Sequence, residues 1–192
     1  LDLIRMVTDE EFCWADSESR EVWANLHAWR ALGQLRAEAA VPPLLSLLHQ
    51  IDDDDDDWVG EELPAVLAMI GPAAVQDIRA YLAKSSNSLY ARIAAAESLK
   101  QIGERYPEAR DESVAALSAQ LEQFDGQDPA LNAFLVSYLI DLKAAEAAPL
   151  IERAFAADEI DASVVGDWED VQVFLGLKVT REHPPRRSRW YP

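Results

Sequence analysis

Apolar residues recur at helical spacing along most of the chain. In segment 21–35 they recur every three residues: Trp23, Leu26, Trp29, Leu32 and Leu35. After a short turn they follow the i, i+3, i+4, i+7 spacing of one helix face: Val41, Leu44, Leu45 and Leu48. Pro42 and Pro43 suit the first turn of this second helix, where no internal N–H donor is needed. The pattern predicts a pair of helices.

The same pattern then returns three times. Similar stripes run through segments 58–84, 88–124 and 128–157. Equivalent leucines near the ends of the four first helices are spaced 35, 32 and 40 residues apart: Leu32, Leu67, Leu99 and Leu139. Self-similarity near this period indicates stacked helical pairs that cover one another's apolar faces. An ordinary helix bundle with coincidental spacing is the alternative.

Turn and cap residues divide the chain further. Gly71 is expected to end one helix and Pro72 to begin the next. Residues 1–16 and 162–177 differ from the repeats, as expected of caps that cover the open ends of a stack. In the second cap, Asp167 is the expected N-cap residue. Three apolar residues there are expected to face inward: Val171, Phe174 and Leu175.

Two segments, RALGQLRAEAAVPPLLSLL (30–48) and LIDLKAAEAAPLIERAF (139–155), resemble HEAT repeats of the phycobilisome-lyase type. The resemblance implies an all-α, right-handed α-α superhelix, a HEAT-like or armadillo-type solenoid of about four helical pairs with capping helices. We therefore expect one domain over 1–177, with caps at 1–16 and 162–177, repeats at 17–51, 58–84, 88–124 and 128–157, and a basic tail at 178–192. HEAT repeats often bend at a proline in the first helix, and Pro64 fits that place.

Composition agrees with an all-α chain, because alanine, leucine and glutamate dominate and no β-branched strand pattern appears. The net charge is −18 at pH 7. The last fifteen residues contribute +4, so the body carries −22, which disfavours nucleic-acid binding through the body. A single cysteine, Cys13, suits a reducing compartment. With no membrane span or signal peptide in the pattern, a cytoplasmic location is expected.

No catalytic constellation stands out. The three histidines, His27, His49 and His183, belong to no recognisable metal or nucleophile motif, and no glycine-rich phosphate loop is present. We assign no catalytic residue, no cofactor and no metal ligand. The family resemblance leaves open a chromophore-lyase-like role, in which the solenoid holds a small molecule in its groove, but no residue is assigned to it.

Residues 51–64, IDDDDDDWVGEELP, join the first repeat to the second. Aspartates ahead of a helix cap its free N–H groups, and Asp56 or Asp57 is the expected cap. The run lacks the alternation of a calcium loop, and Trp58 stands where a ligand would be needed. A solvated capping loop is one interpretation. The other is a surface for a basic partner, because capping leaves four aspartates unexplained: Asp52, Asp53, Asp54 and Asp55.

Second helices of HEAT-like pairs usually line the concave side of the solenoid, and here they carry further acids: Glu112, Glu122, Glu146 and Glu152. Together with the four aspartates they form the predicted partner surface. An acidic groove attracts basic proteins and speeds their association. We therefore expect a non-catalytic adaptor for a basic protein or peptide. Two alternatives remain: tail arginines docking on the acidic face, or an acidity that reflects a salt-rich habitat and serves no partner.

Overall fold

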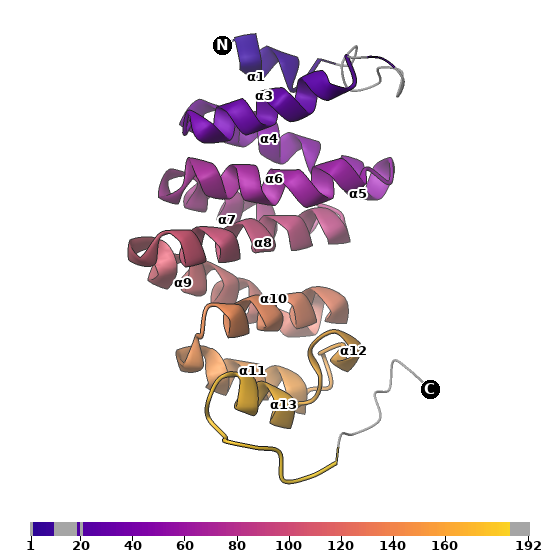
Figure 1. Ribbon diagram of the computed structural model, residues 1–192. Helices are drawn as coiled ribbons and strands as arrows, with labels where there is room; N and C mark the ends of the chain where they lie inside the picture. The colour runs from indigo at the N-terminus through magenta and orange to yellow at the C-terminus, as the bar shows by residue number, and fades with distance from the viewer. Residues whose placement is uncertain (1, 10–18, 20, 185–192) are drawn as a thin grey trace.

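The computed structural model describes residues 2–9, 19 and 21–184, and these residues form α-helices and short 3-10 helices with no strand among them. The all-α prediction is confirmed. The helices form an elongated stack with α1 at one end and α13 at the other (Figure 1). Their bounds are α1 Asp2–Met6, α3 Trp23–Gln34, α4 Val41–Leu47, α5 Gln50–Asp53, α6 Asp57–Ile70, α7 Val75–Ala83, α8 Leu89–Arg105, α9 Arg110–Leu121, α10 Pro129–Asp141, α11 Ala148–Ala156, α12 Ala162–Val165 and α13 Trp168–Phe174.

The longer helices form two rows. In the front row of Figure 1, α3 packs against α6, α6 against α8, and α8 against α10. Behind it, α4 packs against α7, α7 against α9, and α9 against α11. Each front helix and the rear helix that follows it form a pair: α3 with α4, α6 with α7, α8 with α9, and α10 with α11. The small helix α12 packs on α10, and α13 packs on α11, so both lie over the C-terminal end of the stack.

A short 3-10 helix connects the two helices of each pair: η1 Glu38–Ala40, η2 Pro72–Ala74, η3 Pro107–Ala109 and η5 Ala145–Ala147. Its last residue is a buried alanine in all four pairs: Ala40, Ala74, Ala109 and Ala147. In the first and fourth pairs the preceding helix ends at a residue with positive φ, Arg36 or Lys143, and in the second pair at Gly71. The N–H of Ala37 bonds to the carbonyl of Leu32, which is the 6→1 bond of a Schellman end.

One apolar core runs through the whole stack. Its largest fully buried side chains come from both rows and from all four pairs: Leu44, Leu48, Leu63, Leu67, Ile78, Leu82, Leu99, Ile102, Leu117, Leu121, Leu131 and Leu135. Each such side chain stabilises the fold by about 1.5–3 kcal/mol relative to an exposed position. Because a pair shares its apolar faces with its neighbours, the stack has no separate core for each pair.

Three residues of the predicted apolar stripes are exposed, among them Phe174, which was expected to face inward. Trp23 is 46% exposed, Leu35 69% and Phe174 60%. Trp23 begins α3, Leu35 is the C-cap residue of the same helix, and Phe174 ends α13. The periodicity of an apolar stripe does not reveal where the neighbouring helix stops covering it, and this is why the prediction was wrong at these helix ends. Val171 and Leu175 are buried as expected.

Pro64 lies inside α6 and is buried, and Gly71 ends that helix with φ of 95°.

In the part of the chain that the structure describes, no single helix is long and apolar enough to cross a membrane. The segments Asp57–Ile70 and Pro72–Ala83 reach that length and apolarity only when joined, and they bend by 111° at the break between them.

Candidate partner-binding surface

The aspartate run, residues 52–57, spans the end of α5 and the start of α6. Asp56 is the N-cap residue of α6, and its Oδ1 accepts a hydrogen bond from the backbone N–H of Val59 at 3.2 Å. Asp55 has a positive φ of 54°, a backbone conformation that aspartate tolerates better than most residues. The expectation that Asp56 or Asp57 caps the following helix is confirmed for Asp56.

Asp52 caps a different helix. Its Oδ1 accepts from the N–H of Tyr90 at 3.1 Å and its Oδ2 from the N–H of Ala91 at 2.9 Å. Both donors lie in the first turn of α8, whose own N-cap residue, Ser88, makes no side-chain cap. The carboxylate also lies at the positive end of the α8 dipole. Asp52 is therefore a structural cap supplied by the connection between the first and second helix pairs, and the expectation that capping leaves it unexplained was wrong.

The other aspartates of the run face solvent. Asp53, Asp54, Asp55 and Asp57 are exposed. In the described ranges no lysine, arginine or histidine forms an ion pair with any of these four. Four carboxylates close together in the chain thus have no cation among residues 2–9, 19 and 21–184.

Three exposed aromatic side chains lie at the same edge of the stack. Trp23 is the first residue of α3, and Trp58 and Tyr90 are the second residues of α6 and α8. Their exposed fractions are 46%, 52% and 57%. The Trp23 and Trp58 rings contact edge to face, with centroids 5.4 Å apart. Asp52 bonds to the backbone of Tyr90, so the aspartate run lies next to this row.

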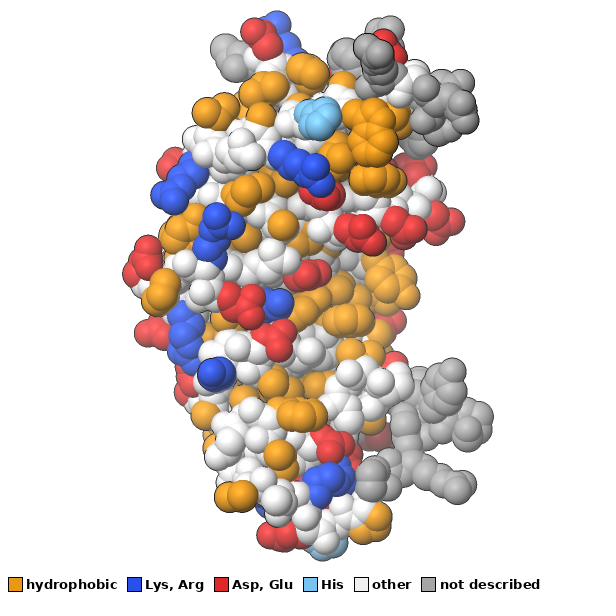
Figure 2. All heavy atoms as spheres, in the orientation of Figure 1, with side chains coloured by type: hydrophobic (Ala, Val, Ile, Leu, Met, Phe, Trp, Pro, Cys, Tyr) orange, Lys and Arg blue, Asp and Glu red, His pale blue; other side chains and the backbone are white. Residues whose placement is uncertain are grey.

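We call Trp23, Trp58, Tyr90, Asp53, Asp54, Asp55 and Asp57 the aromatic–aspartate edge. Figure 2 shows apolar and acidic side chains gathered along that side of the molecule. Sequence reasoning missed the aromatic half of this edge. A signal was present, because the three aromatic residues are spaced 35 and 32 residues apart, as are Leu32, Leu67 and Leu99. The fourth pair has Ala130 at this place, so the row ends at α8.

Of the acids predicted on the second helices, Glu112 and Glu152 lie on α9 and α11, whereas Glu122 is the C-cap residue of α9 and Glu146 lies in η5. Three of the four bind side chains of a neighbouring helix pair. Glu112 accepts from Gln76 Nε2 at 2.6 Å. Glu146 accepts from Arg110 Nη1 at 2.9 Å, and that guanidinium lowers the pKa of the Glu146 carboxyl. Glu122 accepts from Arg153 Nη2 at 3.3 Å. The structure therefore gives these three carboxylates a role in joining successive pairs.

Glu152 is exposed on α11.

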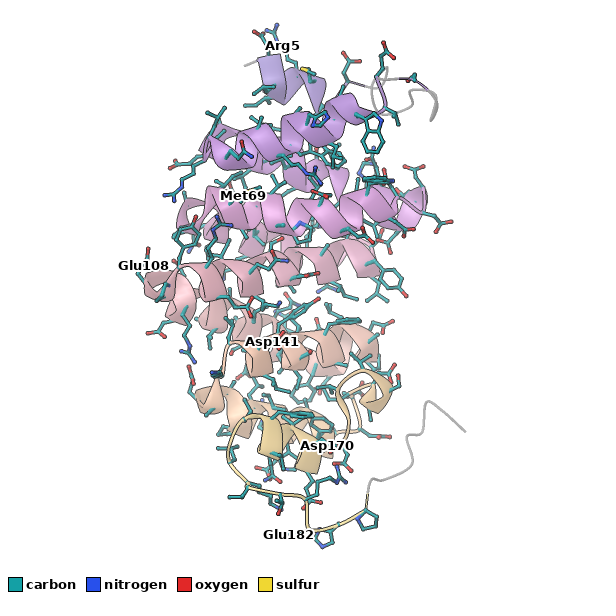
Figure 3. The ribbon with its side chains drawn as sticks, viewed as in Figure 1. Arg5, Met69, Glu108, Asp141, Asp170 and Glu182 are labelled. Atoms are coloured by element: carbon teal, nitrogen blue, oxygen red, sulfur yellow. The ribbon has the colours of Figure 1, made fainter. Side chains whose placement is uncertain are left out.

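The front row has its own link between pairs. Arg30 on α3 forms a bidentate contact with Glu62 on α6: Nε lies 3.0 Å from Oε2, and Nη2 donates to Oε1. This contact lowers the pKa of the Glu62 carboxyl. Figure 3 shows the side chains along the stack, with Met69 labelled on α6.

A buried polar network joins α8 to the α9–α10 connection. Arg92 is 7% exposed; its Nε donates to the carbonyl of Leu82 at 2.9 Å and its Nη2 to Gln127 Oε1 at 3.3 Å. Gln127 also bonds to Gln120 and to the fully buried Asn132. Burial lowers the pKa of the Arg92 guanidinium. These contacts satisfy buried polar groups between helix pairs, so the network has a structural role.

The beginning of the basic tail is docked. Arg181 forms a fork with Asp167, at 3.0 and 2.8 Å, and also pairs with Asp170. Asp167 is the N-cap residue of α13, as predicted, within a capping box that includes Asp170. Lys178 Nζ lies 3.0 Å from Glu169 Oε1. Tail docking on acidic groups thus occurs for Arg181, on α13 of the same chain; Arg186, Arg187 and Arg189 lie outside the described residues.

Glu169, Glu182 and His183 place three possible metal-ligand atoms within 4.8 Å of one another. The ammonium of Lys178 already bonds to Glu169, and the backbone N–H groups of Glu182 and His183 donate to the same carboxylate. A metal ion would compete with these donors, so the cluster is explained as a contact that holds the C-terminal segment.

The histidines lie on three different elements. His27 is exposed on α3, and His183 is exposed in the C-terminal segment. His49 follows α4, and its Nδ1 lies 2.5 Å from the carbonyl oxygen of Ser46. Among the described residues, no hydrogen bond joins His27 and His49. Cys13 lies outside the described residues.

These features define a stacked, all-helical, acidic protein whose most distinctive surface is the aromatic–aspartate edge. Residues 17–183 match the family described as "Protein of unknown function (DUF1186)", and the chain belongs to that family. The match covers all four helix pairs, the edge and the docked part of the C-terminal segment. No curated protein and no solved structure matches the chain.

Proposed function

We propose that this chain is a HEAT-like, right-handed helical-repeat scaffold that binds a positively charged protein or peptide without catalysing a reaction. The two rows of helices, their 3-10 connections and the shared core support the HEAT-like architecture. We place its action in the cytoplasm. The acidity of the body argues against a nucleic-acid partner and in favour of a basic one.

The observation that carries the proposal is the aromatic–aspartate edge. Its four exposed aspartates have no cation in the described part of the chain, and three exposed aromatic rings adjoin them. Arginine and lysine side chains pair with carboxylates and also stack on aromatic faces, which contributes about 0.5–1 kcal/mol at exposed sites. Aromatic residues are frequent among the side chains that dominate binding energy at protein interfaces. The edge therefore suits a cationic segment better than the second-helix acids, three of which have partners within the fold.

Capture experiments with the purified chain test the proposal. One variant removes three charges from the edge: Asp53→Asn, Asp54→Asn and Asp55→Asn. A control variant removes three exposed charges elsewhere: Glu104→Gln, Glu108→Gln and Asp125→Asn. We expect wild type and control to retain the same basic protein at low salt, and less of it at physiological salt, while the edge variant loses it.

Equal capture by the edge variant and the wild type would contradict the proposed site. Capture of acidic proteins, or capture indifferent to salt, would contradict the electrostatic basis. The resemblance to phycobilisome-lyase repeats leaves a chromophore-lyase-like accessory protein or enzyme as an alternative. No observation in the structure favours it, and the scaffold is our conclusion.

A further inference from the structure

The chain carries a segment whose chemistry complements the aromatic–aspartate edge. Residues 185–192, PRRSRWYP, contain three arginines, two aromatic residues and no acid. The edge contains four exposed aspartates without a cation in the described residues, together with Trp23, Trp58 and Tyr90. We propose that the edge of one copy of this protein binds residues 185–192 of a second copy.

The complementarity extends beyond net charge. A planar guanidinium can pair with a carboxylate and stack on an indole ring at the same time, and the edge presents both groups side by side. Prolines at both ends of the segment reduce the conformational freedom that binding must remove. The described beginning of the tail already shows such pairing, since Arg181 binds Asp167 and Asp170.

Chain length favours a second copy over the same copy as the one whose edge residues 185–192 bind. The segment leaves the described chain at Pro184, after the contact with α13, whereas Trp58 lies on α6 (Figure 1). The distance from α13 to α6 is three helix-to-helix spacings, past α10 and α8, and packed helices are spaced about 8–10 Å apart, which gives roughly 24–30 Å. Fully extended, the chain from Pro184 reaches Arg187 within about 11 Å. Arg186 and Arg187 therefore cannot reach Trp58 of their own copy.

A reciprocal exchange, in which each copy gives its segment to the other, closes a dimer through two equivalent contacts. It also places the segment in competition with the basic partner of the proposed function. The inference rests on that proposal in one respect, namely that the edge binds cationic segments.

Sedimentation of the chain with residues 185–192 included tests the self-association. A tail variant carries Arg186→Gln, Arg187→Gln and Arg189→Gln, and an edge variant carries Asp53→Asn, Asp54→Asn, Asp55→Asn and Trp58→Ala. All of these edge positions are exposed, so circular dichroism should confirm an unchanged fold. We expect the wild type to associate, and each variant alone to associate at least about tenfold more weakly. Mixing the two variants should give a heterodimer, because one supplies an intact edge and the other an intact segment. It should be weaker than the wild-type dimer, because only one of the two contacts can form.

A wild type that remains monomeric, or variants that associate as the wild type does, would overturn the inference. A mixture that shows no heterodimer would overturn it as well. A synthetic peptide PPRRSRWYP, titrated onto the tail variant, separates this inference from the proposed function. If the peptide binds and its binding requires the edge, but the wild-type chain is monomeric, the dimer is excluded and the cationic-partner proposal is retained. Absence of peptide binding counts against both.

Discussion

At the scale of single residues, Asp52 is the member of the aspartate run that the fold depends on. It supplies two hydrogen bonds to the first turn of α8, a helix without a side-chain cap of its own. Asp52→Ala should lower the free energy of unfolding by about 1 kcal/mol, the usual cost of losing an N-cap. Urea denaturation followed by circular dichroism measures the change.

The matched control is Asp54→Ala, which removes the same charge from the same run at an exposed position. It should change stability by less than about 0.5 kcal/mol. Equal effects of the two substitutions would show that charge, and not the cap, determines the contribution of Asp52.

Glu169 makes the contact of the C-terminal segment sensitive to pH. The pKa of its carboxyl is lowered to about 2, first by the backbone N–H of Glu182 and then by Lys178 and the N–H of His183. A lowered pKa means that the contact is fully stabilising above the unfolded value of about 4.3. It is lost as the pH falls from there through about 2. NMR should show the amide signals of Glu182 and His183 titrating near the lower value.

The Glu169→Gln variant serves as the control, because it should abolish this titration. A midpoint at the ordinary glutamate value in the wild type would mean that residues 182 and 183 do not dock on Glu169 in solution.

At the scale of elements, the spacing between neighbouring helix pairs depends on glycine in the front row. A Cβ built on Gly33 of α3 would lie 2.7 Å from Met69 Cε and 3.2 Å from the backbone carbonyl oxygen of Val66, both on α6. A Cβ on Gly60, also within a front helix, would meet nothing closer than 3.8 Å. Gly→Ala raises helix propensity by about 1 kcal/mol at either site. The two substitutions should therefore differ in sign.

We expect Gly60→Ala to raise the melting temperature, and Gly33→Ala to lower it because Met69 must change its side-chain conformation and the backbone at Val66 must shift. Thermal unfolding of the two variants under identical conditions measures both changes. Stabilisation by both would show that α3 and α6 separate without cost, and would question the close approach of the first two pairs.

The sequence separation between contacting residues determines which of these features could be predicted from the sequence. Apolar periodicity and local caps sufficed for the four helix pairs and for Asp56 and Asp167, because both depend on residues a few positions apart. The second bond partner of Asp52 lies 39 residues away, and nothing local identifies which helix the aspartate run adjoins. The aromatic row was equally hidden from a search for helix faces. It becomes visible only when the repeat period is applied to residues outside the core.

At the scale of the whole molecule, charge repulsion competes with the ion pairs that join the helix pairs. The chain holds 35 acidic and 17 basic residues. The links Arg30–Glu62, Arg110–Glu146 and Arg153–Glu122 are partly exposed, and such pairs contribute about 0–1 kcal/mol each. The larger effect should be repulsion among the unpaired acids, which salt screens as the Debye length falls from about 10 Å at 0.1 M to about 3 Å at 1 M.

Sodium chloride should therefore raise the melting temperature, and a gain of 1 kcal/mol corresponds to about 2–4 °C for a chain of this size. The edge variant Asp53→Asn, Asp54→Asn, Asp55→Asn should start higher at low salt and gain less, because three of the crowded carboxylates are gone. A melting temperature that falls with salt would mean that the links between pairs outweigh the repulsion. A large rise of the same size in both proteins would show that the repulsion comes from the acidic residues of the body as a whole, as a salt-rich habitat requires. The aspartate run would then give no separate reason to expect a basic partner.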